Sequence, residues 1–289
     1  MGDTYDRRVS AALALLASLL WGTADFFGGT ASRRAPVASV LGLSQLTALL
    51  ALVPVALLTG DLGADRAYVV PAVVAGLVGV GALGAFYRAL ALGTMGVVAP
   101  VAALGVVVPV AVGLLMGETP SLLQGLGIAV AVGGVVLASG PELRGRAGAL
   151  PVVLALFAAV GFGAVLVLIA EGARSSVVMT LLTMRLSAVL ALTALLLATA
   201  SRRGVDLGVP RTALPLIAAV GLGDVLANGA FALASETEGA LVSVTAVLAS
   251  LYPVVTVLLA RQLHGERLRR VQVAGVAGAL SGVALLAGG

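Results

Sequence analysis

The chain has 289 residues, of which 60% are hydrophobic and only 10% are charged, and its mean hydropathy is +1.15. Soluble domains carry about a quarter charged residues and lack apolar runs of twenty, so this composition excludes a soluble protein. The absence of cysteine excludes disulfides and thiol catalysis, and a single histidine, His264, argues against a histidine metal site or catalytic triad. We expect no bound cofactor or metal.

All 17 basic residues are arginines, and the formal net charge is +4. Most of these arginines lie in short segments beside apolar runs, which is typical of residues that set membrane topology and contact anionic lipid. The lipid bilayer is therefore an expected partner and nucleic acid is not. A cleavable signal peptide is not expected, because the first apolar run is too long and further runs follow it.

In chain order, breaks rich in Arg, Gly, Pro and Asp separate ten apolar segments of about 18–25 residues, each long enough to cross a ~30 Å hydrocarbon core. They predict ten transmembrane helices, at residues 10–29, 36–59, 68–92, 95–116, 121–139, 148–170, 176–199, 211–234, 239–260 and 268–287. The alternation of a membrane barrel is missing. The predicted fold class is an all-α, multi-pass membrane protein, and the Ala-, Gly- and Val-rich composition suggests a bacterial plasma membrane.

An internal repeat relates the two halves of the chain. At an offset of 144 residues, similar residues recur in order at Pro71 and Pro215, Gly79 and Gly223, Tyr87 and Phe231, and Pro109 and Pro253. We assign residues 1–143 and 144–289 as two five-helix repeats of one membrane domain. Five is odd, so the second repeat would enter the membrane inverted, as in secondary transporters whose substrate site lies between the halves. A duplication that only builds a stable bundle is the alternative.

The side on which the chain ends lie is ambiguous in the sequence. If both ends are cytoplasmic, 4 arginines lie on that side and 11 on the other, with Arg88 and Arg185 inside spans. The positive-inside rule therefore favours ends that face outward.

Three stretches carry a family resemblance: "LLWGTADFFGG", "YRALALGTMGVVAPVAALGVVVPVAVGLLMGE" and "AVLASLYPVVTVLLARQLHGERLRRVQVAGVAGALSGVALLA". Together they resemble the EamA-like branch of the drug/metabolite transporter superfamily. The resemblance implies five plus five spans and a secondary transporter of small metabolites, often an exporter of amino acids or drugs. It also implies two cytoplasmic ends, against the arginine count, and it assigns no role to Asp25.

Ionisable and amide side chains inside the first-half spans mark candidate sites, because such residues are costly in hydrocarbon. Asp25 in the first span and Arg88 near the end of the third lie in the same half of the bilayer. An ion pair between them would remove most of the cost of burying either group. Gln45 in the second span occupies the repeat position of Arg185.

The second half supplies Arg185, Asp224 and Asn228, the last two being one helical turn apart. In one interpretation, closed pairs Asp25–Arg88 and Arg185–Asp224 only fix helix register. In the other, at least one acid faces a central cavity and binds substrate or proton, since a carboxyl in a dry site can exchange a proton near neutral pH. Asp224, nearest the midplane, is then the better proton carrier, and Arg185 with Asn228 would bind a substrate carboxylate.

Aromatic and proline residues complete the candidate site. Trp21, Tyr87 and Tyr252 are candidates for the cavity walls, with ordinary helix packing as the alternative. Pro109 and Pro253 interrupt backbone hydrogen bonding at repeat-related positions, so they are candidates for paired kinks in a gate.

The leading function is a secondary transporter that moves an amino acid, amine or drug-like compound by alternating access, with proton-coupled export as one form. A structural or lipid-flipping subunit of a membrane complex is the alternative, and a homodimer is open in either case. An intramembrane enzyme is disfavoured, because the chain lacks Cys, an HExxH motif and a G-x-S-x-G nucleophile elbow.

Overall fold

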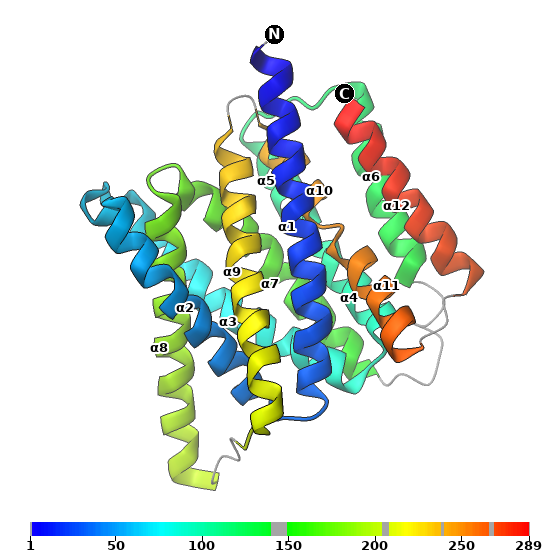
Figure 1. Ribbon diagram of the computed structural model, residues 1–289. Coiled ribbons are helices and arrows are strands. Elements are labelled where there is room, and N and C mark those ends of the chain that lie inside the picture. The colour runs from blue at the N-terminus through cyan, green and yellow to red at the C-terminus, as the bar shows by residue number, and fades with distance from the viewer. Residues whose placement is uncertain (1, 140–148, 204–207, 238–239, 266–268, 289) are drawn as a thin grey trace.

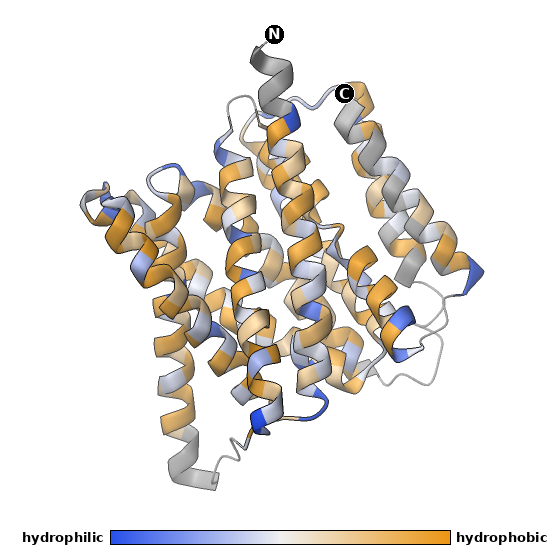
Figure 2. Cartoon of the chain, viewed as in Figure 1, coloured by the Kyte–Doolittle hydropathy of each residue, from blue (hydrophilic) through white to orange (hydrophobic). Residues whose placement is uncertain are grey.

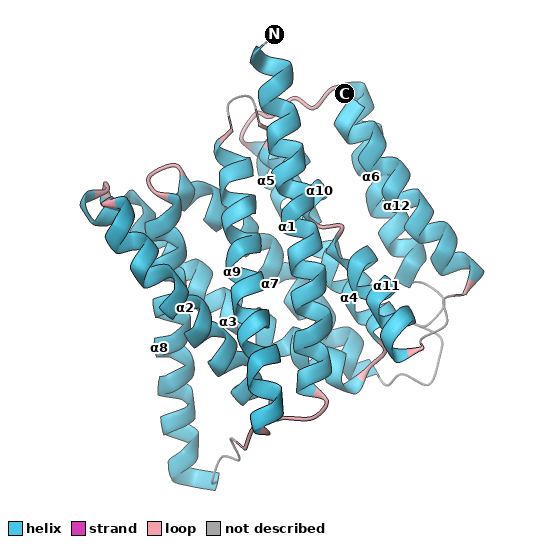
Figure 3. Cartoon of the chain, viewed as in Figure 1, coloured by secondary structure: helices cyan, strands magenta, loops and turns pink. Residues whose placement is uncertain are grey.

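The computed structural model describes residues 2–139, 149–203, 208–237, 240–265 and 269–288. Within these ranges the regular structure is all helical (Figure 3). The α-helices are α1 (Gly2–Ser32), α2 (Val37–Thr59), α3 (Val69–Leu92), α4 (Met95–Ala103), α5 (Val107–Leu115), α6 (Leu122–Ser139), α7 (Ala149–Ala173), α8 (Val177–Arg203), α9 (Leu214–Glu236), α10 (Val242–Ala249), α11 (Tyr252–His264) and α12 (Arg270–Gly288).

Eight segments of the described chain are long and apolar enough to cross a membrane. They are Arg8–Ser32, Val37–Thr59, Arg66–Leu92, Met95–Leu115, Leu150–Ala173, Val177–Ala198, Arg211–Glu236 and Val242–His264. A shorter apolar helix covers Leu122–Gly134, inside the fifth expected span. These segments confirm a multi-pass membrane protein, whereas the count of ten spans stays a prediction.

The outer surface of the helices suits a hydrocarbon environment. Large apolar side chains such as Leu58 and Leu115 are 87% and 88% exposed. Hydrophobic residues predominate along the helices (Figure 2). In water such a surface would be unfavourable, but lipid tails are as apolar as leucine.

The fourth and ninth expected spans are not continuous helices. A 3₁₀ turn at Leu104–Val106 separates α4 from α5, and residues Ser250 and Leu251 separate α10 from α11. Pro109 and Pro253 lie in the first turn of α5 and α11 respectively, where a missing N–H removes no helical hydrogen bond. The prolines therefore explain why both spans restart at repeat-related positions.

The two halves of the chain are interleaved rather than side by side. Helix α1 packs against α9 and α11, α3 against α7 and α8, and α2 against α8 and α9, while α6 and α12 pair at one edge (Figure 1). The start of α1 and the end of α12 lie toward the same end of the molecule (Figure 1). This interleaving surrounds a central cavity with helices from both halves.

Glycines permit the closest of these crossings. A Cβ atom on Gly22 of α1 would overlap the carbonyl oxygen of Tyr252, and one on Gly221 of α9 would overlap that of Ser44 in α2. Membrane helices associate through such small residues because backbone-to-backbone packing replaces the hydrophobic drive available in water. The glycines thus bring the helices that carry the polar residues into contact.

Candidate functional site

A central cavity encloses about 750 Å³ of empty space, part of it open to the outside. Its walls are mostly apolar and come from α1, α2, α3, α7, α8, α9 and the two broken spans. The polar or aromatic side chains that line it are Trp21, Asp25, Gln45, Phe162, Arg185, Asp224, Asn228, Ser250 and Tyr252. A mostly apolar cavity with a few convergent polar groups is the usual form of a small-molecule site.

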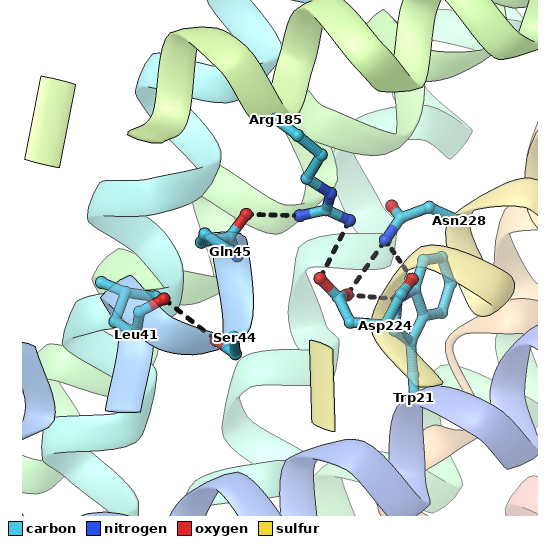
Figure 4. Close-up of polar contacts among 7 residues, drawn as sticks. All are labelled: Trp21, Leu41, Ser44, Gln45, Arg185, Asp224 and Asn228. Atoms are coloured by element: carbon cyan, nitrogen blue, oxygen red, sulfur yellow. Dashed lines mark hydrogen bonds and ion pairs between the residues drawn. The ribbon is translucent and has the colours of Figure 1, made fainter. Parts of the chain in front are cut away.

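The carboxylate of Asp224 lies at the centre of a closed polar network (Figure 4). Its Oδ1 accepts hydrogen bonds from Trp21 Nε1 at 3.2 Å and from Asn228 Nδ2 at 2.9 Å, and its Oδ2 forms an ion pair with Arg185 Nη2 at 2.9 Å. The pair is largely buried, with side chains 4% and 16% exposed for Arg185 and Asp224. Three nitrogen partners therefore engage both oxygens of this carboxylate.

The same network joins the two halves of the chain. Arg185 Nη1 on α8 donates to Gln45 Oε1 on α2 at 2.8 Å (Figure 4). Asp224 and Asn228 are one turn apart on α9, so they present to the same face. The predicted contact between Arg185 and Asp224 is therefore confirmed, with Gln45 as an additional partner from the first half.

Asp25 is the second acid of the cavity, and its surroundings differ from those of Asp224. It lies one turn after Trp21 on α1 and is only 7% exposed, yet it lines the cavity. Within the described part of the chain, its carboxyl makes no hydrogen bond or ion pair. An acid so buried and unpaired is costly unless a proton or a cation accompanies it.

The predicted ion pair between Asp25 and Arg88 is wrong. Arg88 is exposed on α3 and does not line the cavity, whereas the preceding residue, Tyr87, is fully buried. Consecutive residues of a helix point about 100° apart, so only one of the two can face the centre. The side chain of Tyr87 points inward and its ring packs against Gly28 of α1. Like Arg88, however, Tyr87 does not line the cavity.

Tyr252 lies at the start of α11 and lines the cavity, as expected. It is 7% exposed, and among the described residues its hydroxyl has no hydrogen-bond partner. One turn later, Thr256 Oγ1 contacts the carbonyl oxygens of Gly22, at 3.0 Å, and Tyr252, at 3.2 Å. This contact fixes α11 to α1 beside Asp25.

Pro109 and Pro253 are both buried at the restart of the broken spans. Among the polar or aromatic residues that line the cavity, two were missed by the sequence reasoning. Ser250 occupies the break before Pro253, so the proline was a usable signal. Phe162 lies in α7, an apolar span in which no periodic pattern distinguishes the inner face, so nothing in the sequence indicated it.

A polar cluster joins the ends of α1, α3 and α11. The guanidinium of Arg33 donates from Nε to Leu90 O at 3.3 Å and from Nη2 to Gly93 O at 3.2 Å. Its Nη1 lies 3.3 Å from Nδ1 of His264, whose Nε2 lies 3.3 Å from Thr30 Oγ1. These contacts hold the ends of α1, α3 and α11 together. On α1 they lie past Asp25, at the end of the helix.

Comparison with known proteins agrees with this architecture. A solved structure, described only as "Crystal structure of protein", has a TM-score of 0.71 at 20% sequence identity over 96% of this chain and 95% of that one, which shows a shared fold. No relative among curated proteins matches the sequence. Residues 8–140 and 149–288 each match the EamA-like transporter family, one match in each half. The chain therefore belongs to the EamA-like transporter family, a family of membrane transporters.

Proposed function

We propose that this chain is a secondary transporter that moves a small metabolite across the membrane by alternating access, with the central cavity as its substrate site. The observation that carries the proposal is that both halves supply the cavity's polar groups, with Gln45 of the first half bound to Arg185 of the second. A site shared between two halves changes its access when the halves rock against each other.

An inverted repeat is the symmetry we propose for these halves. The repeat makes α1 equivalent to α7 and α3 equivalent to α9, so a two-fold relation would exchange the α1–α9 contact with the α3–α7 contact. Both contacts are extensive, and α6 packs on its own counterpart, α12. Reciprocal packing of this kind supports a pseudo-two-fold axis between the halves.

We propose Asp25, rather than Asp224, as the proton-coupling residue. The three nitrogen partners of Asp224 occupy both of its oxygens. Asp25 faces the same cavity without a partner in the described structure, so it can take up a proton and release it without disrupting a network. Exchange of a proton for substrate at Asp25 would couple export to the proton gradient.

The test is uptake of a mixed panel of amines, amino acids and drug-like compounds into proteoliposomes under an imposed pH gradient. Wild type is compared with Asp25→Asn and with Asp65→Asn, an exposed loop acid whose replacement changes charge equally without touching the cavity. We expect gradient-driven accumulation of at least one compound in wild type and Asp65→Asn, and its loss in Asp25→Asn. Equal accumulation in all three proteins would reject Asp25 as the coupling residue, and no accumulation by wild type would reject transport.

A further inference from the structure

We infer that the cavity selects a monovalent organic cation with a flat apolar body, which binds at Asp25 and Tyr252 in competition with a proton. The inference rests on the proposed function only in treating this cavity as the ligand site. It departs from the sequence-based expectation of a zwitterion held by Arg185 and Asn228.

The charge balance of the cavity favours a cation. The described residues that line it carry two carboxylates, Asp25 and Asp224, and one guanidinium, Arg185. The guanidinium is bound to Asp224 and to Gln45, and Asn228 also donates to Asp224. One negative charge is therefore left without a counter-charge, and it lies at Asp25.

Two of the three guanidinium nitrogens of Arg185 are already engaged, Nη1 by Gln45 and Nη2 by Asp224, and only the buried Nε has no hydrogen-bond partner among the described residues. Recruiting Arg185 for an anionic ligand would require breaking its ion pair with Asp224 and leaving that acid buried and unpaired, which is strongly unfavourable. The remaining cavity groups near α11 are acceptors or hydroxyls. Pro109 and Pro253 at the two breaks contribute no N–H donor.

Three aromatic side chains line the same cavity as Asp25. Trp21 precedes Asp25 by one turn on α1, Tyr252 lines the cavity from α11, and Phe162 lines it from α7. Aromatic faces attract organic ammonium groups, and such cages are the usual recognition of quaternary amines. An inorganic cation would instead need several oxygen ligands, which this mostly apolar lining does not assemble.

Tyr252 adds a polar contact that the protein itself leaves unused. Its buried hydroxyl has no partner within the described residues, and Asp25 acts on it electrostatically. A protonated amine that bridges the Asp25 carboxylate and the Tyr252 oxygen would satisfy both groups, and a quaternary ammonium would satisfy the charge alone. The unmade hydrogen bond is thus a second, independent indication of a ligand at this position.

Competition with protons follows from the groups that face Asp25. The ionisable residues that interact with it from the packed helices are Asp224 on α9, Tyr87 on α3 and Tyr252 on α11, with Arg185 of α8 bound to Asp224. Each tyrosine is neutral at ordinary pH, and the arginine and Asp224 offset each other. Only the protonation of Asp25 itself then removes the negative charge that attracts the cation.

The experiment measures binding in detergent, without transport, through the fluorescence of Trp21, which is the single tryptophan of the chain and lines the cavity. Benzyltrimethylammonium is the probe, with its neutral carbon isostere neopentylbenzene and the anion 4-phenylbutyrate as comparison ligands. We expect the cation to bind at least tenfold more tightly than either. As the pH falls below the value at which Asp25 takes up a proton, the apparent Kd of the cation should rise by about tenfold per pH unit.

The variants locate this binding. Asp25→Asn should weaken benzyltrimethylammonium at least tenfold and remove the pH dependence, while Asp65→Asn should match wild type. The primary amine 3-phenylpropylammonium can donate a hydrogen bond, so Tyr252→Phe should weaken its binding several-fold. The binding of benzyltrimethylammonium, which cannot donate, should change little in the same variant.

Preference for the anion, failure of all three ligands to bind, or equal cation binding by wild type and Asp25→Asn would overturn the cation assignment. The transport proposal would survive each of these results, because its uptake panel also includes amino acids and drug-like compounds that carry no net positive charge. Conversely, if the cation binds but the wild type accumulates no compound of the panel, transport is rejected and the assignment of the cation site is retained.

Discussion

At the scale of single residues, the network around Asp224 contributes to stability only as a complete unit. Arg185→Ala should destabilise the protein by about 3–5 kcal/mol, because it leaves the Asp224 carboxylate buried without its counter-ion. The double variant Arg185→Met/Asp224→Leu should recover most of this loss, since apolar replacement of a buried pair is often neutral. Reversible unfolding in detergent measures both, and a double variant less stable than Arg185→Ala would contradict this explanation.

The charged residues that need a partner could be picked out from the sequence, but the direction of a side chain around its helix could not. Arg185 and Asp224 were matched correctly because two opposite charges at similar depth in apolar spans must compensate each other. Asp25 and Arg88 meet the same criterion, but they do not form an ion pair in the structure. An all-apolar helix carries no periodic pattern that tells which side faces inward. The burial of Tyr87 beside Gly28 decides that direction, and this contact between α1 and α3 is tertiary information.

At the scale of helices, close crossings at glycine position the site. Gly221→Ala should destabilise the protein by about 1–3 kcal/mol, because the new methyl group would overlap the Ser44 carbonyl where α9 crosses α2. Gly223→Ala on the same helix is the matched control: its methyl group would meet Ala24 Cβ at an ordinary 3.5 Å. We expect no loss there and a gain of up to about 1 kcal/mol from helix propensity. Thermal unfolding distinguishes the two, and equal effects would contradict the assigned crossing.

Helix breaks were partly predictable. Pro109 and Pro253 indicated where the second helix of each broken span begins, but not that α4 and α10 end several residues earlier. The start of α10 also depends on a distant partner: Glu118 accepts hydrogen bonds from the Val242 and Ser243 amides at 2.8 and 3.2 Å. A cap supplied from 124 residues away cannot be deduced from local sequence.

At the scale of the whole molecule, the fold class, the multi-pass membrane character and the family were all predictable, because apolar runs and a repeat dominate the sequence. The interleaving of the two halves explains why residues far apart in the chain, such as Gln45 and Arg185, meet at one cavity. Alternating access requires this interleaved body to open at either end of the cavity in turn. The cluster of Arg33, Thr30 and His264 links the ends of α1, α3 and α11. Opening of this end would separate these helix ends, so the cluster is a suitable place to test such motion.

The most direct measurement uses the natural absence of cysteine in this chain. Thr30→Cys/His264→Cys is reconstituted and joined by a short bismethanethiosulfonate reagent, with each single-cysteine variant as a control. The account predicts that the cross-link stops gradient-driven uptake, that reductant restores it, and that the singly modified controls keep transporting. Uptake by the cross-linked protein at the rate of its reduced form would contradict alternating access through this end of the molecule.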